Sequence, residues 1–319
     1  MKYLTFSLLL CTLLFLGACQ QNGPASSASG PTFSVLLPEG ASDEPLDGRL
    51  ILMLSTNQEA EPRFQIQDGP NTQLAFGTDV EGWAPGTSRD FPLDAFGYPI
   101  RSLGEVPSGK YHVQALLHRY ETFQRGDGHT VKMPMDRGEG QQWNRAPGNL
   151  YNQPMEIELT TKASSPVAIT LDQKIPPIEE PKDTKYIKHI KIQSKLLTEF
   201  WGRPMYLGAH VLLPEGFDER TDVKYPLAIM HGHFPRDFGG FSTTPPDTTK
   251  PCEYSSRFQV DCYNRFVDQE AYDFYKTWTG PDFPRVVAIK IQHANPFYDD
   301  SYAVNSENLG PYGDAITYE

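Results

Sequence analysis

A proline-rich stretch at residues 173–182 divides the chain into two parts whose strand-forming segments follow different patterns. It reads Gln-Lys-Ile-Pro-Pro-Ile-Glu-Glu-Pro-Lys. Proline fixes φ and has no backbone N–H to donate, so three prolines in a short polar stretch fit neither a helix nor the interior of a sheet. We therefore expect a semi-rigid linker at residues 174–184, with one structural unit before it and another after it.

Before the linker, the chain contains short apolar or alternating runs bounded by turn residues. These runs fall at residues 33–37, 49–54, 111–118, 155–159 and 167–171. Alternation with a period of two indicates half-buried strands, and no helical periodicity of useful length accompanies it. The spacing is typical of an antiparallel β-sandwich. We expect residues 33–173 to form a β-sandwich-like accessory domain.

After the linker, the apolar runs become nearly continuous. Residues 226–230 and 285–292 are runs of this kind, and further strands are expected at residues 186–193 and 207–213. Continuous apolar strands indicate a sheet covered on both faces, as in α/β folds. Helices are expected at residues 264–278 and from about residue 314 onward. The 28 prolines and 26 glycines of the 319-residue chain argue against a helix bundle.

The first eighteen residues have the layout of an export signal. Lys2 gives a basic start, residues 6–16 are almost wholly apolar, and Leu-Gly-Ala precedes Cys19. The apolar run is shorter than the roughly 20 residues of a spanning helix. The end of the run resembles the lipobox of bacterial lipoproteins, in which the cysteine is acylated and becomes the mature N-terminus. An ordinary cleaved signal followed by a chance cysteine is the alternative.

The lipobox resemblance implies a protein held on the lipid bilayer of a bacterial cell envelope through acylated Cys19. Two or three acyl chains hold a protein on a membrane stably. Residues 19–32 are rich in Gln, Ser, Ala, Gly and Pro and predict a flexible tether. Gln20 stands where an aspartate retains lipoproteins in the inner membrane of enteric bacteria, which favours the outer membrane.

The net charge limits the kinds of partner, and the cysteines indicate whether a disulfide or a metal site is expected. The chain has 40 acidic and 28 basic side chains, a net charge of −12, so nucleic acid is excluded as a partner. Of its four cysteines, Cys11 lies in the signal and Cys19 carries lipid. The remaining pair, Cys252 and Cys262, favours a disulfide in an exported protein over a metal site, because no second closely spaced pair is present.

Three segments of the second half resemble the putative esterase family of the α/β-hydrolases, which includes feruloyl and enterochelin esterases. They are Gly-Ala-His-Val-Leu-Leu-Pro-Glu-Gly-Phe at 208–217, Tyr-Pro-Leu-Ala-Ile-Met-His-Gly at 225–232, and Ser-Tyr-Ala-Val-Asn-Ser-Glu-Asn-Leu-Gly-Pro-Tyr-Gly-Asp-Ala at 301–315. The resemblance implies that residues 185–319 are the N-terminal part of an α/β-hydrolase domain that hydrolyses carboxylic esters, some of them glycan-linked, without a cofactor.

The same resemblance implies an oxyanion hole at Gly232 and His233, where a backbone N–H would meet the substrate oxygen. A simple strand-ending turn is the alternative interpretation of these two residues. The loop at residues 295–312 would lie near the mouth of the site, and a solvated surface loop is its alternative.

The sequence departs from the family at the catalytic serine. An esterase of this kind needs Gly-x-Ser-x-Gly on a strand–helix elbow, followed by an acid and a histidine. No serine of the chain has glycine at both −2 and +2. We therefore expect the chain to be C-terminally truncated before the nucleophile and to be inactive alone. Its 226–230 strand would then be an uncovered edge, and the C-terminal half alone would be poorly stable.

Two further classes of function remain open. A non-catalytic surface lipoprotein would bind a glycan or protein partner through the β-rich half. A metal-dependent enzyme would use His231 and His233, but Pro235 stands where the zinc-hydrolase pattern needs aspartate. His293 is expected to be a loop or core residue. Trp143, Trp201 and Trp278 are expected to be packing residues, with stacking on a sugar as the alternative.

Overall fold

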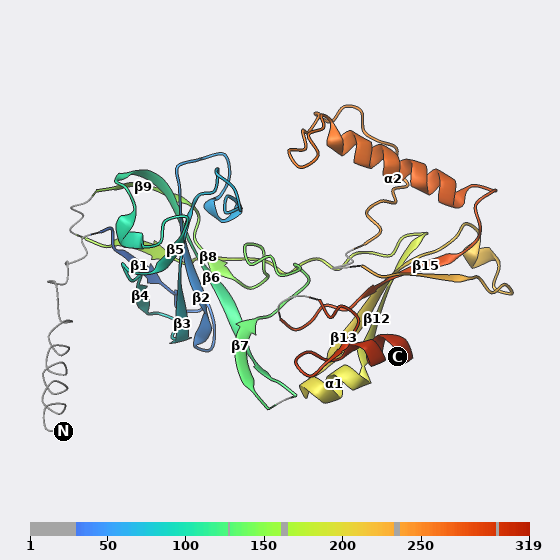
Figure 1. The fold of residues 1–319 in the computed structure, drawn as a ribbon, viewed down its shortest axis with the longest axis horizontal. Helices are drawn as coiled ribbons and strands as arrows, with labels where there is room; N and C mark the ends of the chain where they lie inside the picture. The colour runs from blue at the N-terminus through green and yellow to red at the C-terminus, as the bar shows by residue number, and fades with distance from the viewer. Residues whose placement is uncertain (1–29, 127, 161–164, 233–236, 298–299) are drawn as a thin grey trace, which may run out of the picture.

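The computed structural model describes residues 30–126, 128–160, 165–232, 237–297 and 300–319. The signal peptide, Cys19, most of the tether and His233 lie outside the described residues. The described chain forms two groups of strands, one from each half of the sequence (Figure 1). Within this part of the chain, no helix combines the length and the apolar character needed to cross a membrane.

The first half is built almost entirely of strands, as the alternating runs predict. They are β1 (Phe33–Leu36), β2 (Leu46–Ser55), β3 (Leu74–Trp83), β4 (Ser88–Asp90), β5 (Phe96–Tyr98), β6 (Gly109–Gln124), β7 (Thr130–Pro134), β8 (Leu150–Tyr151), β9 (Met155–Leu159), β10 (Val167–Thr170) and β11 (Gln173–Lys174). Two single 3₁₀ turns, Pro62–Phe64 and Leu103–Glu105, interrupt them.

These strands form two sheets around one hydrophobic core. The smaller sheet has the order β10-β1-β4, and the larger one has the order β11-β8-β6-β2-β3-β5, with β7 and β9 also paired to β6. Alternate side chains of a strand point to one face, so Leu50 and Leu52 of β2 enter the same core as Phe33 of β1 and Ile169 of β10. The β-rich character predicted for this half is confirmed.

Two details of the prediction for this half are wrong. The sandwich was expected to be antiparallel, but β1 and β10 pair in parallel, whereas the other strand pairs among the described residues of this half are antiparallel. The linker was expected to begin at residue 174, but Lys174 pairs with Leu150 and Ile175 is buried. The sheet thus continues one residue into the expected linker, and the next residue, Ile175, is still buried.

The second half mixes strands and helices. Its elements are β12 (Ile187–Ser194), α1 (Lys195–Trp201), β13 (Met205–Leu212), a 3₁₀ turn (Phe217–Glu219), β14 (Leu227–Met230), α2 (Tyr263–Thr279), β15 (Val287–Gln292), β16 (Asn305–Ser306), β17 (Gly310–Pro311) and α3 (Tyr312–Tyr318). The four strands and two helices predicted here are confirmed. The short helix α1 was not predicted.

The strands of this half form a sheet with the order β12-β13-β15-β14. β13 is antiparallel to both of its neighbours, whereas β14 runs parallel to β15. β14 is the last strand on its side among the described residues, and Leu227, Ile229 and Met230 are all exposed. The uncovered edge expected for this strand is confirmed.

A hydrophobic cluster joins the two halves. Phe123 of β6 is buried against Trp201 of α1 and Phe297, with ring centroids 6.0 and 5.0 Å away. Beside it, the Asp136 N–H donates to the Pro296 carbonyl at 3.0 Å. The β6–β7 hairpin therefore reaches from the first half into the core of the second (Figure 1).

Candidate functional site

The candidate site lies where two neighbouring strands of the second sheet end. β14 is followed by His231 and Gly232, and β15 is followed by His293. Because these strands are parallel, with Met230 opposite Lys290, both carboxyl ends meet at the same edge of the sheet. Open α/β sheets bind ligands at this edge. A cavity of about 710 Å³ lies here.

Three segments line this cavity. The strand ends supply Ile229, His231, Gly232, Ile291 and His293; the following loop supplies Asp300, Tyr302 and Ala303; and α3 with its first turn supplies Gly313, Ile316 and Thr317. The loop expected near the mouth of the site is thus placed against the cavity. Its lining combines apolar surface with a few polar groups, as small-molecule sites commonly do.

Gly232 lines the cavity and has free space beside its Cα atom. A Cβ built at this position would meet no atom within 4 Å, so glycine is not required here by crowding from the protein. The open space instead allows another molecule to approach the backbone closely. His233, the other residue expected at the oxyanion hole, lies outside the described residues, so the structure brings only Gly232 of the expected pair to the cavity.

His293 and Ser301 form a contact that the sequence analysis did not predict. The Ser301 hydroxyl oxygen lies 2.9 Å from Nδ1 of His293, and the Ser301 N–H donates to the His293 carbonyl at 3.2 Å. The same hydroxyl accepts the Ala303 N–H at 3.1 Å. Both side chains are buried. This serine holds a turn together, in contrast to a nucleophile that stands exposed on an elbow.

Tyr312 fixes the other end of the loop. Its ring is fully buried, and its hydroxyl donates to the Ala294 carbonyl at 3.0 Å. Burial raises the pKa of the Tyr312 phenol, so the hydroxyl stays protonated and remains a donor. The Asn305 side chain accepts the Asp314 N–H at 2.9 Å, near the start of α3. The loop is therefore anchored to β15 on one side and to α3 on the other.

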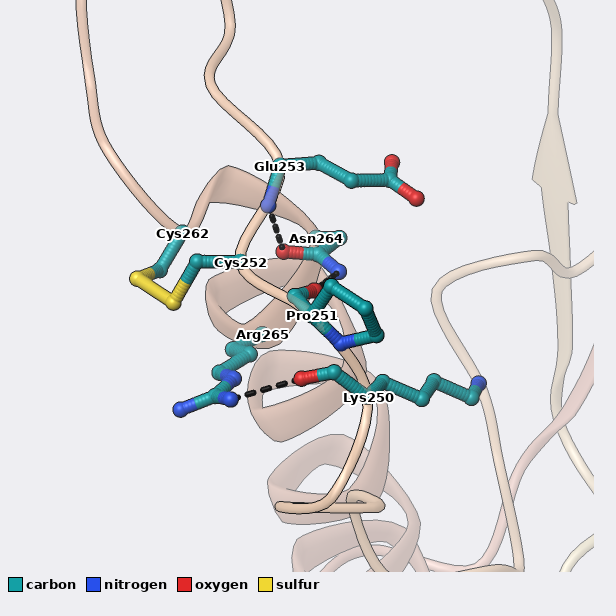
Figure 2. The surroundings of a disulfide bond; sticks show 7 residues. All are labelled: Lys250, Pro251, Cys252, Glu253, Cys262, Asn264 and Arg265. Carbon is teal, nitrogen blue, oxygen red and sulfur yellow. Dashed lines mark hydrogen bonds between the residues drawn. A yellow bond between two sulfur atoms is a disulfide. The ribbon is translucent and has the colours of Figure 1, made fainter.

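Cys252 and Cys262 form a disulfide away from this cavity (Figure 2). The bond closes the loop that leads into α2. Asn264 accepts the Glu253 N–H at 3.1 Å and donates to the Pro251 carbonyl at 3.0 Å, and Arg265 donates to the Lys250 carbonyl at 2.6 Å. The first turn of α2 and the loop before it are therefore held together by one covalent bond and several hydrogen bonds.

The tryptophans contribute packing, as expected. Trp201 and Trp278 are buried, and their indole N–H groups donate to the carbonyls of Leu309 and Leu213. Trp143 packs with Met53 and Tyr151 on the outer face of the larger sheet. Within the described part of the chain, no three His, Cys, Asp or Glu side chains are grouped closely enough to hold a metal ion.

The site offers a backbone position open to a substrate, at Gly232, beside a polar loop and an apolar strand edge. Apolar surface with a few polar groups is typical of sites for small molecules. No protein-family model matches the sequence, and a search of curated proteins found no match. The geometry and the sequence motifs therefore carry the functional argument.

Proposed function

We propose that residues 185–319 are the first part of an α/β-hydrolase domain, and that the protein is the N-terminal portion of a lipid-anchored serine esterase. The order β12-β13-β15-β14 is the observation that carries this proposal. In the usual hydrolase sheet, the strand corresponding to β14 lies between the strand corresponding to β15 and the nucleophile strand. Among the described residues, β14 has β15 on one side and no strand on the other, where the nucleophile strand would lie.

The proposed chemistry is acyl transfer. A serine oxygen attacks the ester carbonyl and passes its proton to a histidine; the alkoxide leaves as an alcohol after it receives that proton. Water then attacks the acyl-enzyme and releases the acid. The N–H of Gly232 or of its neighbour would stabilise the negative oxygen formed in each step. Gly-x-Ser-x-Gly is absent from these 319 residues, and the proposal therefore assigns the nucleophile to a further segment of the protein.

The proposed anchor is acylated Cys19, with residues 20–32 as the tether between the lipid and the β-rich half. The support for this part is the order of basic start, apolar run and Leu-Gly-Ala-Cys in the sequence. The acyl chains would place the esterase at the surface of a bacterial membrane.

Substitution of Gly232 tests the proposed oxyanion hole. A Cβ at Gly232 would project into open space and would displace the substrate oxygen from its donor, whereas a Cβ at Gly240 also meets no atom within 4 Å but lies off the cavity. We expect Gly232→Ala, in a protein that includes the coding sequence downstream of Glu319, to lower kcat for p-nitrophenyl acetate by about 10²-fold. Gly240→Ala should leave kcat unchanged.

Two results would contradict the proposal. One is equal activity of the Gly232→Ala and Gly240→Ala proteins, which would show that Gly232 is not part of an oxyanion hole. The other is complete absence of ester hydrolysis from the longer protein, which would favour a lipoprotein that binds a partner without catalysis. Circular dichroism of both variants controls for folding.

A further inference from the structure

The loop before α2 and the first turns of this helix carry exposed aromatic and apolar side chains. In Figure 1 they lie at the outer border of the second half. Four of these side chains are between 40% and 60% exposed: Tyr254, Phe258, Phe266 and Val267. Single exposed apolar side chains are common on protein surfaces, whereas a contiguous group of them marks a binding surface.

The four side chains belong to one patch, because Tyr263 connects them. The Phe258 ring stacks on the Tyr263 ring, with centroids 4.9 Å apart. The Tyr263 N–H donates at 2.9 Å to the carbonyl of the residue before Tyr254, which brings that part of the loop to the start of α2. Phe266 and Val267 follow Tyr263 by three and four residues and so lie on its side of the helix. We call these five residues the α2 patch.

The backbone that carries the α2 patch is held in place. The disulfide between Cys252 and Cys262 closes the loop beside the first turn of α2 (Figure 2). Inside the loop, Ser255 and Val260 exchange backbone hydrogen bonds of 3.0 and 3.3 Å. A preformed surface loses less conformational entropy on binding than a surface that must first be ordered. The patch therefore presents its apolar side chains without a folding step.

The charges around the patch do not attract an anionic partner. Residues 247–270 carry five carboxylates and three Lys or Arg side chains. Lys250 pairs with Asp268 at 3.7 Å, and the Arg257 guanidinium lies 5.2 Å from the Phe258 ring centroid. The excess of carboxylates repels anionic lipid headgroups. Burial of apolar surface is therefore the main binding force that the patch offers.

The tether indicates which apolar surface lies within reach. Acylated Cys19 and the tether at residues 20–32 belong to the proposed function, on which this step rests. A chain of thirteen residues spans at most about 45 Å, so the anchor would keep the bilayer close to the folded protein. The effective concentration of lipid at the protein surface is then high, and a weak contact suffices. Tyrosine is typical of the boundary between lipid and water.

We propose that the α2 patch binds the headgroup region of a zwitterionic phospholipid bilayer. It is a second membrane contact, separate from the acyl anchor, and it uses the second half of the chain. Two contacts hold a protein on a membrane in one orientation, whereas a flexible tether alone leaves the protein free to rotate.

Co-sedimentation with phosphatidylcholine vesicles tests this inference. The protein is the chain without its signal, residues 19–319 with Cys19→Ser, which keeps every described residue and cannot be acylated. We expect binding that persists in about 0.5 M NaCl and weakens when phosphatidylglycerol is added. Phe258→Gln and Phe266→Gln should each lower the partition coefficient about tenfold, equivalent to about 1.4 kcal/mol. Phe96→Gln, which removes an exposed ring on β5, should leave it unchanged.

Three results would overturn the inference: no binding at millimolar lipid, binding that requires phosphatidylglycerol or is lost at high salt, or binding that both patch variants leave unchanged. The product of the complete coding sequence, with the same Cys19→Ser, should bind equally. Loss of binding there would show that another segment covers the patch, and would overturn the inference as well. Circular dichroism of each variant controls for folding.

The proposed function is tested by separate measurements. The mass of the native protein reports acylation of Cys19, and ester hydrolysis is measured without vesicles. Vesicle binding by a protein that is never acylated would contradict only the proposed anchor. An acylated, active esterase whose Cys19→Ser form does not bind vesicles would contradict only the role of the α2 patch.

Discussion

His118 is a half-buried histidine on β6 whose surroundings disfavour its charged form. Burial, and secondarily the positive charge of Arg137, lower the pKa of His118 to about 4. Its ring packs edge-to-face on Tyr120, with centroids 5.9 Å apart. The side chain is therefore neutral at pH 7, and folding keeps it neutral far below the pH at which an unfolded histidine takes up a proton.

This difference makes stability depend on pH. The folded pKa lies below the unfolded value of 6.5, so the unfolded chain binds the proton first and stability is lost as pH falls from 6.5 toward 4. Between pH 7 and pH 5 the loss attributable to His118 is about 2 kcal/mol. Urea unfolding at both pH values should show a smaller loss in His118→Gln. An equal loss in both proteins would contradict this account.

Ser301 and Gly232 show what single positions in the sequence can reveal. The apolar run at residues 226–230 predicts a strand, and this local pattern is enough to place Gly232 just after a strand end. The contact between Ser301 and His293 depends on the path of the loop between them, which no periodicity encodes. The pair was therefore missed, although Ser301 lies in the segment predicted to border the site and His293 lies two residues before it.

Among the elements, α1 shows why short helices escape sequence patterns. Its seven residues are too few for a repeating apolar stripe. The signals that were present are the caps: Ser194 accepts the Leu197 N–H, and Gly202 ends the helix in the left-handed conformation. The long helix α2 and the β-branched strand β15 carry strong patterns, and both were predicted within three residues of their observed ends.

The disulfide before α2 gives a prediction at this scale. It closes a loop of ten residues, and the chain-entropy model gives such a crosslink about 2–3 kcal/mol of stabilisation. The double variant Cys252→Ser, Cys262→Ser should lose that amount in chemical unfolding. Dithiothreitol should lower the stability of the native chain to that of the variant and leave the variant unchanged. A native chain insensitive to dithiothreitol would contradict the prediction.

On the scale of the whole molecule, the two halves share a core although their sequence patterns separate at the linker. The patterns predict the halves themselves, because each sheet has its own strand signature. They do not predict that Phe123 is buried between Trp201 and Phe297, because packing between distant segments has no sequence period. The shared cluster predicts that the two halves hold together.

Cleavage of the linker tests this coupling. A protease site inserted between Glu180 and Pro181 lies in an exposed segment without helix or strand. After cleavage, the two fragments should coelute in gel filtration, because the cluster around Phe123 still joins them. Phe123→Ala removes a buried ring, at a cost of about 3–5 kcal/mol, and should release the second fragment, which then aggregates through the open edge of β14. Separation of the fragments without that substitution would contradict the prediction.

The most direct test of the proposed esterase is covalent labelling with a fluorophosphonate. The probe is applied to the product of the complete coding sequence, including any codons that follow Glu319, and the labelled peptide is identified by mass spectrometry. The account predicts one labelled serine, within Gly-x-Ser-x-Gly and outside residues 1–319, and no label on Ser301. Label on a serine within these 319 residues, or no label anywhere in the complete product, would contradict it.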